Sequence, residues 1–148
     1  WTFFDDNHLD LNRNFSAGWQ PEPHQEGAGP YAGSAPEARA VMQFASETPT
    51  LFFWLNLHTF GGVFIRPLGD APDHKLPGDD RALFRLVEEW AEEHAGIPTV
   101  SGFTEFTYVP EKPLCGDLVD FAYHQRGAYA FYFMAPGEIL VEVAYREA

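Results

Sequence analysis

An Asn and an Arg stand side by side, as Asn12 and Arg13, in the polar segment Asp10-Leu11-Asn12-Arg13-Asn14-Phe15. A planar guanidinium can grip a carboxylate through two parallel hydrogen bonds, and an adjacent amide adds a directional donor. The pair could therefore bind the anionic end of a ligand. The other interpretation is structural, namely an Arg that caps a loop or pairs with Asp10.

A histidine, His58, follows the apolar run Leu51–Leu57 and precedes Thr59-Phe60-Gly61-Gly62. Open α/β sheets bind ligands at the carboxyl ends of their strands, and a neutral imidazole at such a position can bind Zn²⁺. The glycines after it would let the backbone approach a ligand closely. The alternative is a core or loop histidine that is hydrogen-bonded to the backbone. A catalytic zinc ion needs three protein ligands, and His58 supplies one.

Together, the Asn-Arg segment and Leu57-His58-Thr59-Phe60 resemble the second half of the catalytic domain of the zinc carboxypeptidases, the carboxypeptidase A-like peptidase family M14. The resemblance extends from Phe4 to about Phe133. It implies that Asn12 and Arg13 hold the C-terminal carboxylate of a peptide substrate. It also implies that His58 is the third zinc ligand.

The resemblance places the other two zinc ligands in a His-x-x-Glu motif upstream of the Asn-Arg segment. No His-x-x-Glu occurs in this sequence, which starts at Trp1. We therefore interpret residues 1–148 as the C-terminal portion of a single carboxypeptidase domain. The remaining ligands are expected in a missing N-terminal half, and the portion alone is expected to be inactive.

Two further substrate contacts are implied by the resemblance. Tyr108 corresponds to a tyrosine on a mobile loop that closes over the substrate carboxylate, although it could also be one more stacked aromatic. Val119 falls where the family places the residue at the base of the specificity pocket. An apolar residue there would favour hydrophobic C-terminal side chains over basic ones, because a buried Lys or Arg would lack a partner.

The general base has two possible registers. The family carries a Glu on a strand in this region, which activates water and later protonates the leaving amine. Without gaps, Ala130-Phe131-Tyr132-Phe133 leads to Met134 at that position, and a thioether cannot take a proton from water. With an insertion, Leu140-Val141-Glu142-Val143 supplies Glu142 instead. Glu138 is a third candidate, but it follows Pro136-Gly137 and is expected in a hairpin turn. We assign Glu142 as the base, because the Asn-Arg, His and Tyr elements are all retained.

Hydrophobic spacing and capping signals predict three helices. The expected ranges are Ser34 to about Ser46, Asp79 or Asp80 to about His94, and Asp117 to Arg126. The first starts with the capping box Ser34-Ala35-Pro36-Glu37. The inward faces are expected to consist of Ala38, Val41, Met42 and Ala45 in the first helix, and of Leu83, Leu86, Val87, Trp90 and Ala91 in the second.

The apolar run Leu51–Leu57 predicts a strand that is buried on both faces. Shorter strands are expected over Val63–Ile65, Ala130–Met134 and Ile139–Val143. Helices that alternate with strands indicate an α/β fold. The fold that the resemblance implies is a partial carboxypeptidase domain, with a mixed, mostly parallel sheet flanked by helices.

Composition limits the classes of partner. Twenty-two acidic against nine basic residues give a formal charge of −13, which repels phosphate backbones and argues against nucleic-acid binding. No stretch approaches the roughly 20 apolar residues that a membrane span needs. The 45% hydrophobic and 16% aromatic content is enough for a compact core.

The resulting hypothesis is a zinc metallocarboxypeptidase that uses Zn²⁺ to hydrolyse peptides with a free C-terminal carboxylate. The alternative is a non-catalytic relative that binds peptides through the retained carboxylate-recognition loop. A generic α/β domain of unrelated function is the third interpretation. It would be favoured if Asn12, Arg13 and His58 did not converge in space.

Overall fold

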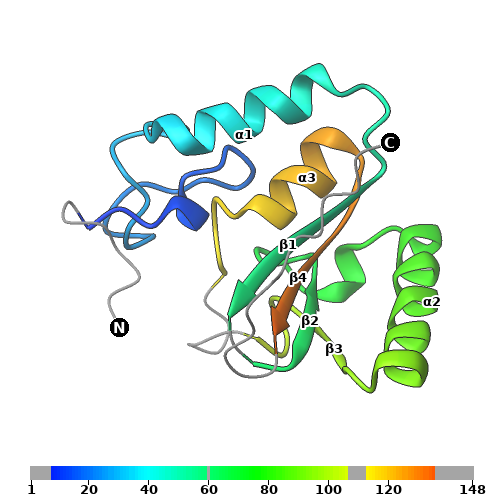
Figure 1. Cartoon of the computed structure of the whole chain (residues 1–148). Helices are drawn as coiled ribbons and strands as arrows, with labels where there is room; N and C mark the ends of the chain where they lie inside the picture. The colour runs from blue at the N-terminus through cyan, green and yellow to red at the C-terminus, as the bar shows by residue number, and fades with distance from the viewer. Residues whose placement is uncertain (1–7, 60, 107–112, 136–148) are drawn as a thin grey trace.

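The computed structural model describes residues 8–59, 61–106 and 113–135 of the chain (Figure 1). Tyr108 and Glu142 therefore lie outside the described residues. The elements follow one another in the order η1 (Leu11–Arg13), α1 (Pro36–Glu47), β1 (Phe53–Thr59), β2 (Val63–Arg66), η2 (Asp73–Lys75), α2 (Gly78–Ala95), β3 (Thr99–Ser101), α3 (Leu118–Arg126) and β4 (Tyr129–Ala135).

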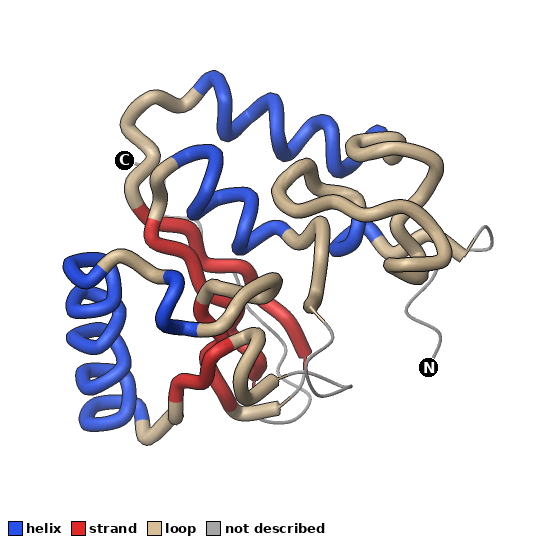
Figure 2. The backbone as a smooth tube through the Cα atoms, turned by 180° about the vertical axis from the view of Figure 1, so that it is seen from behind, coloured by secondary structure: helices blue, strands red, loops and turns tan. Residues whose placement is uncertain are grey.

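The described strands form one mixed sheet in the order β1-β4-β2-β3. β1 pairs with β4 and β2 with β3 in parallel, whereas β2 and β4 are antiparallel. α3 packs against β1 and β4 and contacts α1, while α2 lies against β3. Figure 2, from the opposite side, shows the strands between α2 and the other two helices. The α/β class with a mixed sheet is confirmed.

The helix α1 forms over nearly the predicted range, but the predicted capping box does not cap its N-terminus. Its N-cap residue is Ala35, and no side chain caps it. The Ser34 hydroxyl instead accepts a hydrogen bond from Asn14 Nδ2 at 2.8 Å, and Asn14 Oδ1 accepts one from the Ala35 amide at 2.9 Å. Asn14 is fully buried, so this loop side chain satisfies the helix start that the capping box was expected to satisfy.

In this chain the strand β1 is half-buried on one face and exposed on the other, which differs from the two buried faces that were predicted. Phe53, Leu55 and Leu57 are 40%, 43% and 52% exposed. Alternate side chains of a strand point to opposite faces, and Trp54, Asn56 and His58 point the other way. β1 stands at one end of the described sheet, and no described helix covers the face that bears Leu55.

The helix α2 is rotated relative to the expected inward face. Ala91 is buried and Val87 packs against the core, as predicted. Leu83, Leu86 and Trp90, however, are 44%, 62% and 60% exposed, and Phe84 is buried instead. The Phe84 ring takes the inner position because it packs among aromatic rings of α3 and β4, which sequence spacing alone does not show. Those rings belong to Tyr123, Tyr129 and Phe131, with centroids 5.3–5.7 Å from that of Phe84.

The helix α3 forms as its end signals predict. Asp117 is the N-cap, and its carboxylate accepts a hydrogen bond from the Asp120 amide at 2.9 Å. Gly127 closes the helix in the left-handed conformation, with φ 65°. A buried cluster joins α3 to the sheet, and it consists of Ile65, Val119, Ala122, Ala128, Ala130, Tyr132 and Met134. Among the described helices, none has the length and apolar character that crossing a membrane requires.

Candidate active site

The carboxyl ends of β1 and β4 meet at one edge of the sheet, because these strands run parallel. Their register places His58 beside Met134 and Asn56 beside Tyr132. Paired residues of neighbouring strands point to the same face of a sheet. Tyr132 and Met134 belong to the cluster with Val119 of α3, so His58 lies on the face that α3 covers.

The loop that contains η1 is fixed against the start of α3. Asn12 Oδ1 accepts a hydrogen bond from the Leu118 amide at 3.1 Å, and the Phe15 amide donates to the Gly116 carbonyl at 2.8 Å. Gly116 has φ 71°, and a Cβ atom there would lie 2.5 Å from the Arg13 carbonyl oxygen. A glycine is therefore needed at position 116, where the η1 loop passes close to the chain before α3. This close approach holds Asn12 and Arg13 against the start of α3.

The Asn12 side chain is oriented by its bond to α3. Since Oδ1 faces the Leu118 amide, the amide nitrogen Nδ2 points elsewhere as a donor. Within the described residues, Nδ2 has no hydrogen-bond partner. The backbone is fixed as well, because Asp10 Oδ1 accepts a hydrogen bond from the Asn12 amide at 2.8 Å. The geometry therefore presents a positioned donor next to Arg13.

Arg13 makes the structural contacts that its sequence context allowed. Its Nη1 donates to the Asn12 carbonyl at 2.6 Å, and its Nε lies 3.8 Å from Asp10 Oδ2. The side chain is 14% exposed. No described residue binds Nη2. The guanidinium is thus held in place by its own loop while one nitrogen stays available to an anion.

His58 lies in the electrostatic field of the same loop. Burial lowers the pKa of its imidazole, while Asp10 acts to raise it and Arg13 to lower it further. The net shift favours the neutral ring, which is the form that binds a metal ion. Asn12, Arg13 and His58 converge at one edge of the sheet, and this argues against the generic-domain interpretation.

Tyr132 connects these groups. Its ring packs edge-on against His58, with centroids 5.0 Å apart. Its hydroxyl oxygen lies 2.7 Å from Asp117 Oδ1 and 3.1 Å from Asn12 Oδ1, and it accepts a hydrogen bond from the Val119 amide at 3.3 Å. One hydroxyl hydrogen cannot serve both acceptors, and the shorter contact to Asp117 is favoured. Burial, followed by Asp117, raises the pKa of Tyr132 well above its usual value, so the phenol keeps its proton.

Three carboxylates gather at the start of α3. Asp120 accepts hydrogen bonds from the Gly69 amide at 3.0 Å and the Asp70 amide at 3.2 Å. Burial, and then the charges of Asp117 and Asp70, raise the pKa of Asp120 well above its usual value. Burial also raises the pKa of Asp117. The His124 side chain is the main cause of the lowered pKa of Asp70.

Of the other predicted site residues, two are described by the structure and two are not. Val119 is 1% exposed and its side chain belongs to the buried cluster under α3. Met134, the gapless candidate for the base position, lies beside His58 in the register of β1 and β4. Glu142, which we assign as the base, lies outside the described residues, as does Tyr108.

The donor set around His58 fits one ligand of a zinc site. Within the described ranges, one group of three possible ligands lies close enough together to hold a metal, and it consists of Asp70, Asp120 and His124, with ligand atoms within 4.8 Å of one another. His58 is not part of that group. A half-buried, neutral imidazole suits zinc, and within the described ranges His58 belongs to no group of three possible ligands.

Sequence reasoning missed two residues of this site, Tyr132 and Asp117. For each of them the sequence holds a local pattern that could have pointed to the site. Tyr132 is two residues before Met134, so strand alternation puts it on the same face as the predicted base position. Asp117 begins a predicted helix, and a cap residue is fixed beside whatever lies at that helix end. What the sequence could not show is that the Tyr132 hydroxyl spans the distance to Asn12.

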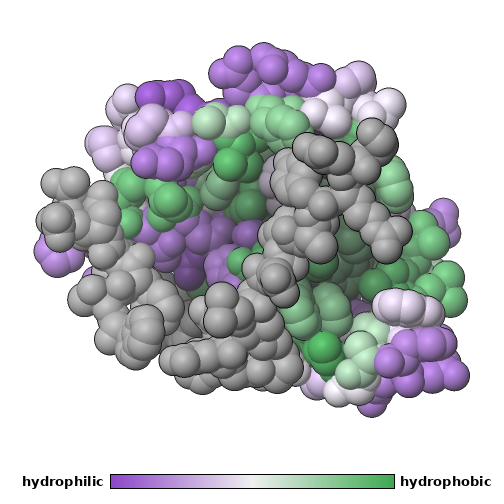
Figure 3. All heavy atoms as spheres, viewed as in Figure 1, coloured by the Kyte–Doolittle hydropathy of each residue, from purple (hydrophilic) through white to green (hydrophobic). Residues whose placement is uncertain are grey.

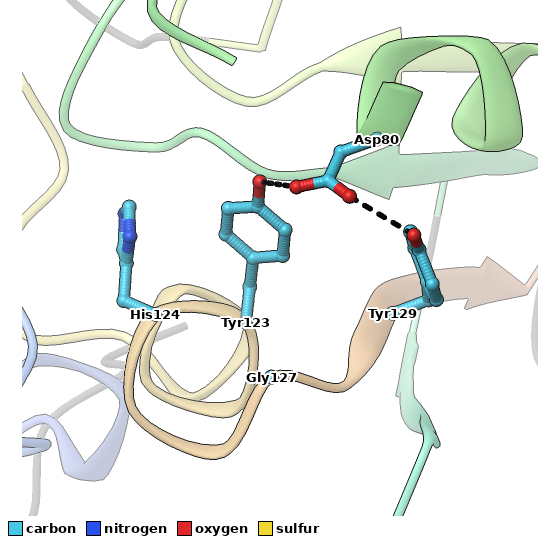
Figure 4. A pocket seen from close by; sticks show the side chains of 5 residues that line it. All are labelled: Asp80, Tyr123, His124, Gly127 and Tyr129. Atoms are coloured by element: carbon cyan, nitrogen blue, oxygen red, sulfur yellow. Dashed lines mark hydrogen bonds between the residues drawn. The ribbon is translucent and has the colours of Figure 1, made fainter. Parts of the chain in front are cut away.

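Two hollows of the described surface lie apart from His58. One, of about 320 Å³, is lined by Asp80, Tyr123, His124, Gly127 and Tyr129 (Figure 4). The other, of about 500 Å³, is lined by Gly18, Gln20, His24, Asp70, Pro113 and Cys115. Figure 3 shows hydrophilic side chains within a hollowed region of the face seen in Figure 1, with hydrophobic side chains bordering it.

Comparison with known proteins identifies the family of the chain. A family model described as zinc carboxypeptidase matches residues 6–140. Carboxypeptidase B of Rattus norvegicus is 32% identical over 136 residues, which cover 82% of this chain and 31% of that protein. Carboxypeptidase B of Homo sapiens is 30% identical over 135 residues, which cover 84% of this chain and 31% of that protein.

Solved structures share the fold. Carboxypeptidase A from Helicoverpa armigera gives a TM-score of 0.68 at 20% identity, covering 95% of this chain and 34% of that one. Thrombin activatable fibrinolysis inhibitor gives 0.63 at 23% identity, covering 85% of this chain and 33% of that one. This chain spans about a third of the length of the relatives that it matches. The family match over nearly all of its residues means that the chain belongs to the zinc carboxypeptidase family.

Proposed function

We propose that the full-length protein is a zinc metallocarboxypeptidase, a hydrolase that releases C-terminal residues from peptides. One observation carries the proposal. Asn12 and Arg13, which offer donors suited to a carboxylate, converge with His58 at the carboxyl ends of two parallel strands, and Tyr132 contacts both His58 and Asn12. Membership of the zinc carboxypeptidase family supports this interpretation.

The substrate is proposed to be a peptide with a free C-terminal carboxylate. Asn12 Nδ2 and the free Arg13 nitrogen would donate to its two oxygens, since the other atoms of both side chains are held by Leu118, Asp10 and the backbone. An internal peptide bond offers no such anion, so this contact selects chain ends. Tyr108 is proposed to close over the bound carboxylate.

Zinc is proposed as the cofactor, with His58 as one ligand. The chemistry that zinc supplies in such a site is polarisation of the scissile carbonyl and a lowered pKa of the attacking water. Residues 1–148 are proposed to form the C-terminal portion of one carboxypeptidase domain. Its remaining part would contribute the other two ligands, so the portion alone would hold zinc weakly and would not hydrolyse peptides.

The general base is proposed to be Glu142. A carboxylate can take a proton from water and return it to the leaving amine, whereas the Met134 thioether beside His58 cannot. The two possibilities separate in one variant of the full-length protein. Glu142→Gln should lower kcat by more than about 100-fold if Glu142 is the base, since general bases contribute about 10²–10⁴-fold. An unchanged kcat would contradict the assignment.

The test of the proposed function is to measure zinc content and hydrolysis of N-blocked dipeptides with the full-length protein. We expect one zinc per molecule and release of the C-terminal residue. His58→Gln should weaken zinc binding by more than about 100-fold, because loss even of a supporting contact costs about 10–100-fold. His94→Gln, a change at an exposed histidine of α2, is the matched control and should leave zinc binding unchanged.

The carboxylate contact is tested separately. Arg13→Ala should lower kcat/KM by about 100-fold or more, because loss of one partner of a buried charge pair costs about 2–5 kcal/mol. Arg39→Ala removes an exposed guanidinium from α1 and should change kcat/KM little. Peptide binding without stoichiometric zinc and without hydrolysis would exclude the enzyme and leave only carboxylate binding.

A further inference from the structure

The Tyr132 side chain occupies the space between the carboxylate-binding pair and the proposed zinc ligand. Its ring centroid lies 5.0 Å from that of His58, and its hydroxyl oxygen lies 3.1 Å from Asn12 Oδ1. The side chain of the C-terminal residue must begin between these groups, because its carboxylate would bind at Asn12 and Arg13 while its amide bond lies near the metal. Tyr132 therefore stands where that side chain would extend.

The base of this space is closed beneath the phenol. Val119, the residue expected at the base of the specificity pocket, is 1% exposed, and its amide donates to the Tyr132 hydroxyl oxygen at 3.3 Å. Tyr132 is itself 9% exposed. The apolar Val119 side chain, which predicts a preference for hydrophobic residues, is thus buried in the cluster that it shares with Tyr132.

Moving the phenol aside would break more than packing contacts. Its hydroxyl lies 2.7 Å from Asp117 Oδ1, and Asp117 is 4% exposed. Displacement by a large ligand side chain would leave the Asp117 carboxylate and the Val119 amide without this partner in a buried region. The hydrogen bonds therefore oppose rotation of Tyr132 to admit a larger group.

We propose that Tyr132 is a specificity-determining residue that restricts the protein to peptides ending in a small residue, such as glycine or alanine. This inference rests on the proposed function. It narrows the hydrophobic preference expected from Val119 to small side chains, because the Tyr132 side chain, and not that of Val119, contacts both His58 and Asn12. Large aliphatic, aromatic and basic C-terminal residues are excluded by the volume of the phenol.

The experiment uses the full-length protein and N-blocked dipeptides ending in Gly, Ala, Leu, Phe or Lys. Hydrolysis and binding by calorimetry are measured for each peptide. We expect kcat/KM for Ala to exceed that for Phe by at least about tenfold, the lower end of discrimination by pocket size. Tyr132→Ala should raise kcat/KM for Phe by at least about tenfold. Tyr132→Phe keeps the ring but loses the hydrogen bonds that hold it, so it should raise kcat/KM for Phe by less than Tyr132→Ala does.

Phe133→Ala is the matched control, since it removes a ring from the same strand on the opposite face, where Phe133 packs against Phe64. It should leave the preference unchanged. Equal kcat/KM values for peptides ending in Ala and in Phe, measured with the unmodified protein, would overturn the role of Tyr132 and leave the proposed function intact. This test does not require that Tyr132→Ala folds. Absence of any hydrolysis would refute the proposed function. In that case tighter binding of peptides ending in Ala than of those ending in Phe would still support the restriction, and equal binding or no binding would refute it.

Discussion

Two carboxylate–phenol groups flank β4, and they lie on opposite faces of the strand. In one, the Tyr132 hydroxyl lies 2.7 Å from the Asp117 carboxylate at the start of α3. In the other, Asp80 of α2 accepts hydrogen bonds from the hydroxyls of Tyr123 and Tyr129, at 2.5 Å and 3.0 Å, beside the hollow drawn in Figure 4. The chemistry of the two groups is the same, but their surroundings differ.

The two groups differ in their access to solvent. Asp117 is 4% exposed, whereas Asp80 is half-buried at the rim of a hollow. Burial raises the pKa of Asp117, and a second buried acid, Asp120, lies beside it. The Asp80 group can exchange its hydrogen bonds for water at little cost, whereas the Asp117 group cannot. The comparison indicates that the Asp117 group fixes the geometry of the site, while the Asp80 group ties α2 to α3 and β4.

The largest difference in stability between the two groups should appear when each carboxylate is removed in turn. Asp117→Ala should lower the free energy of unfolding by about 3 kcal/mol, because it removes a helix cap worth about 1 kcal/mol and leaves buried donors unpaired. Asp80→Ala should cost about 1 kcal/mol, the net value of typical hydrogen bonds with access to water. Urea unfolding of both variants measures the contrast.

Asp117→Asn is the matched variant for this comparison. It retains an oxygen that can cap α3 and accept from the Tyr132 hydroxyl, so its stability should stay close to that of the unmodified protein. Equal losses for Asp117→Ala and Asp80→Ala would mean that burial does not distinguish the two groups.

The pH dependence of stability should report the buried pair of acids. The raised pKa of Asp120 means that the folded protein binds its proton more tightly than the unfolded chain does. Its stabilising contribution is therefore present below the ordinary value near 3.8 and is lost as pH rises through the raised pKa. Asp120→Asn should remove this loss, so the variant should gain stability relative to the unmodified protein as pH increases.

The measurement for this prediction is the difference in unfolding free energy between the two proteins at several pH values. The lowered pKa of Asp70, beside His124, acts in the opposite direction, but it is present in both proteins. Asp117 and Asp120 lie close together, so the two acids titrate as a pair. Asp79→Asn, at the exposed start of α2, reports the effect of net charge alone. A difference that does not change with pH would contradict the prediction.

Local signals predicted the parts of this fold that depend on local physics. The helix caps of α3 and the end of α2 at Gly96 follow from residues within a turn of each other, so spacing was sufficient. We could predict only from the family resemblance that Asn12, Arg13 and His58 lie together. No local pattern links a loop to a strand that lies so much further along the chain. The face of α2 was predicted correctly for Val87 and Ala91 but not for Leu86, because Phe84 and Leu86 are both apolar and only the rings of distant elements decide between them.

The site beyond those motifs depended on long-range contacts. Tyr132 reaches Asn12 across more than a hundred positions of sequence, and its role follows from the register of β4 against β1. A strand pattern gives the face of a side chain but not the partner at its tip. The same limitation applies to Ser34, whose hydroxyl was expected to cap α1 and instead binds the buried Asn14.

The smallest difference between the two groups should come from removing their phenol hydroxyls. Tyr123→Phe removes one of two hydroxyls that donate to Asp80, and Tyr129 together with water can satisfy the carboxylate, so the loss should be below about 1 kcal/mol. Tyr132→Phe leaves Asp117 and the Val119 amide without this partner, and the expected loss is about 2 kcal/mol, within the range for an unsatisfied buried group. Urea unfolding of the two variants under one set of conditions gives the difference directly. The order matters more than either value, because both changes delete the same oxygen atom from the same type of ring. A greater loss for Tyr123→Phe would show that the hydroxyl beside the hollow, and not the one under the site, is the more important structural contact of β4 and its neighbours.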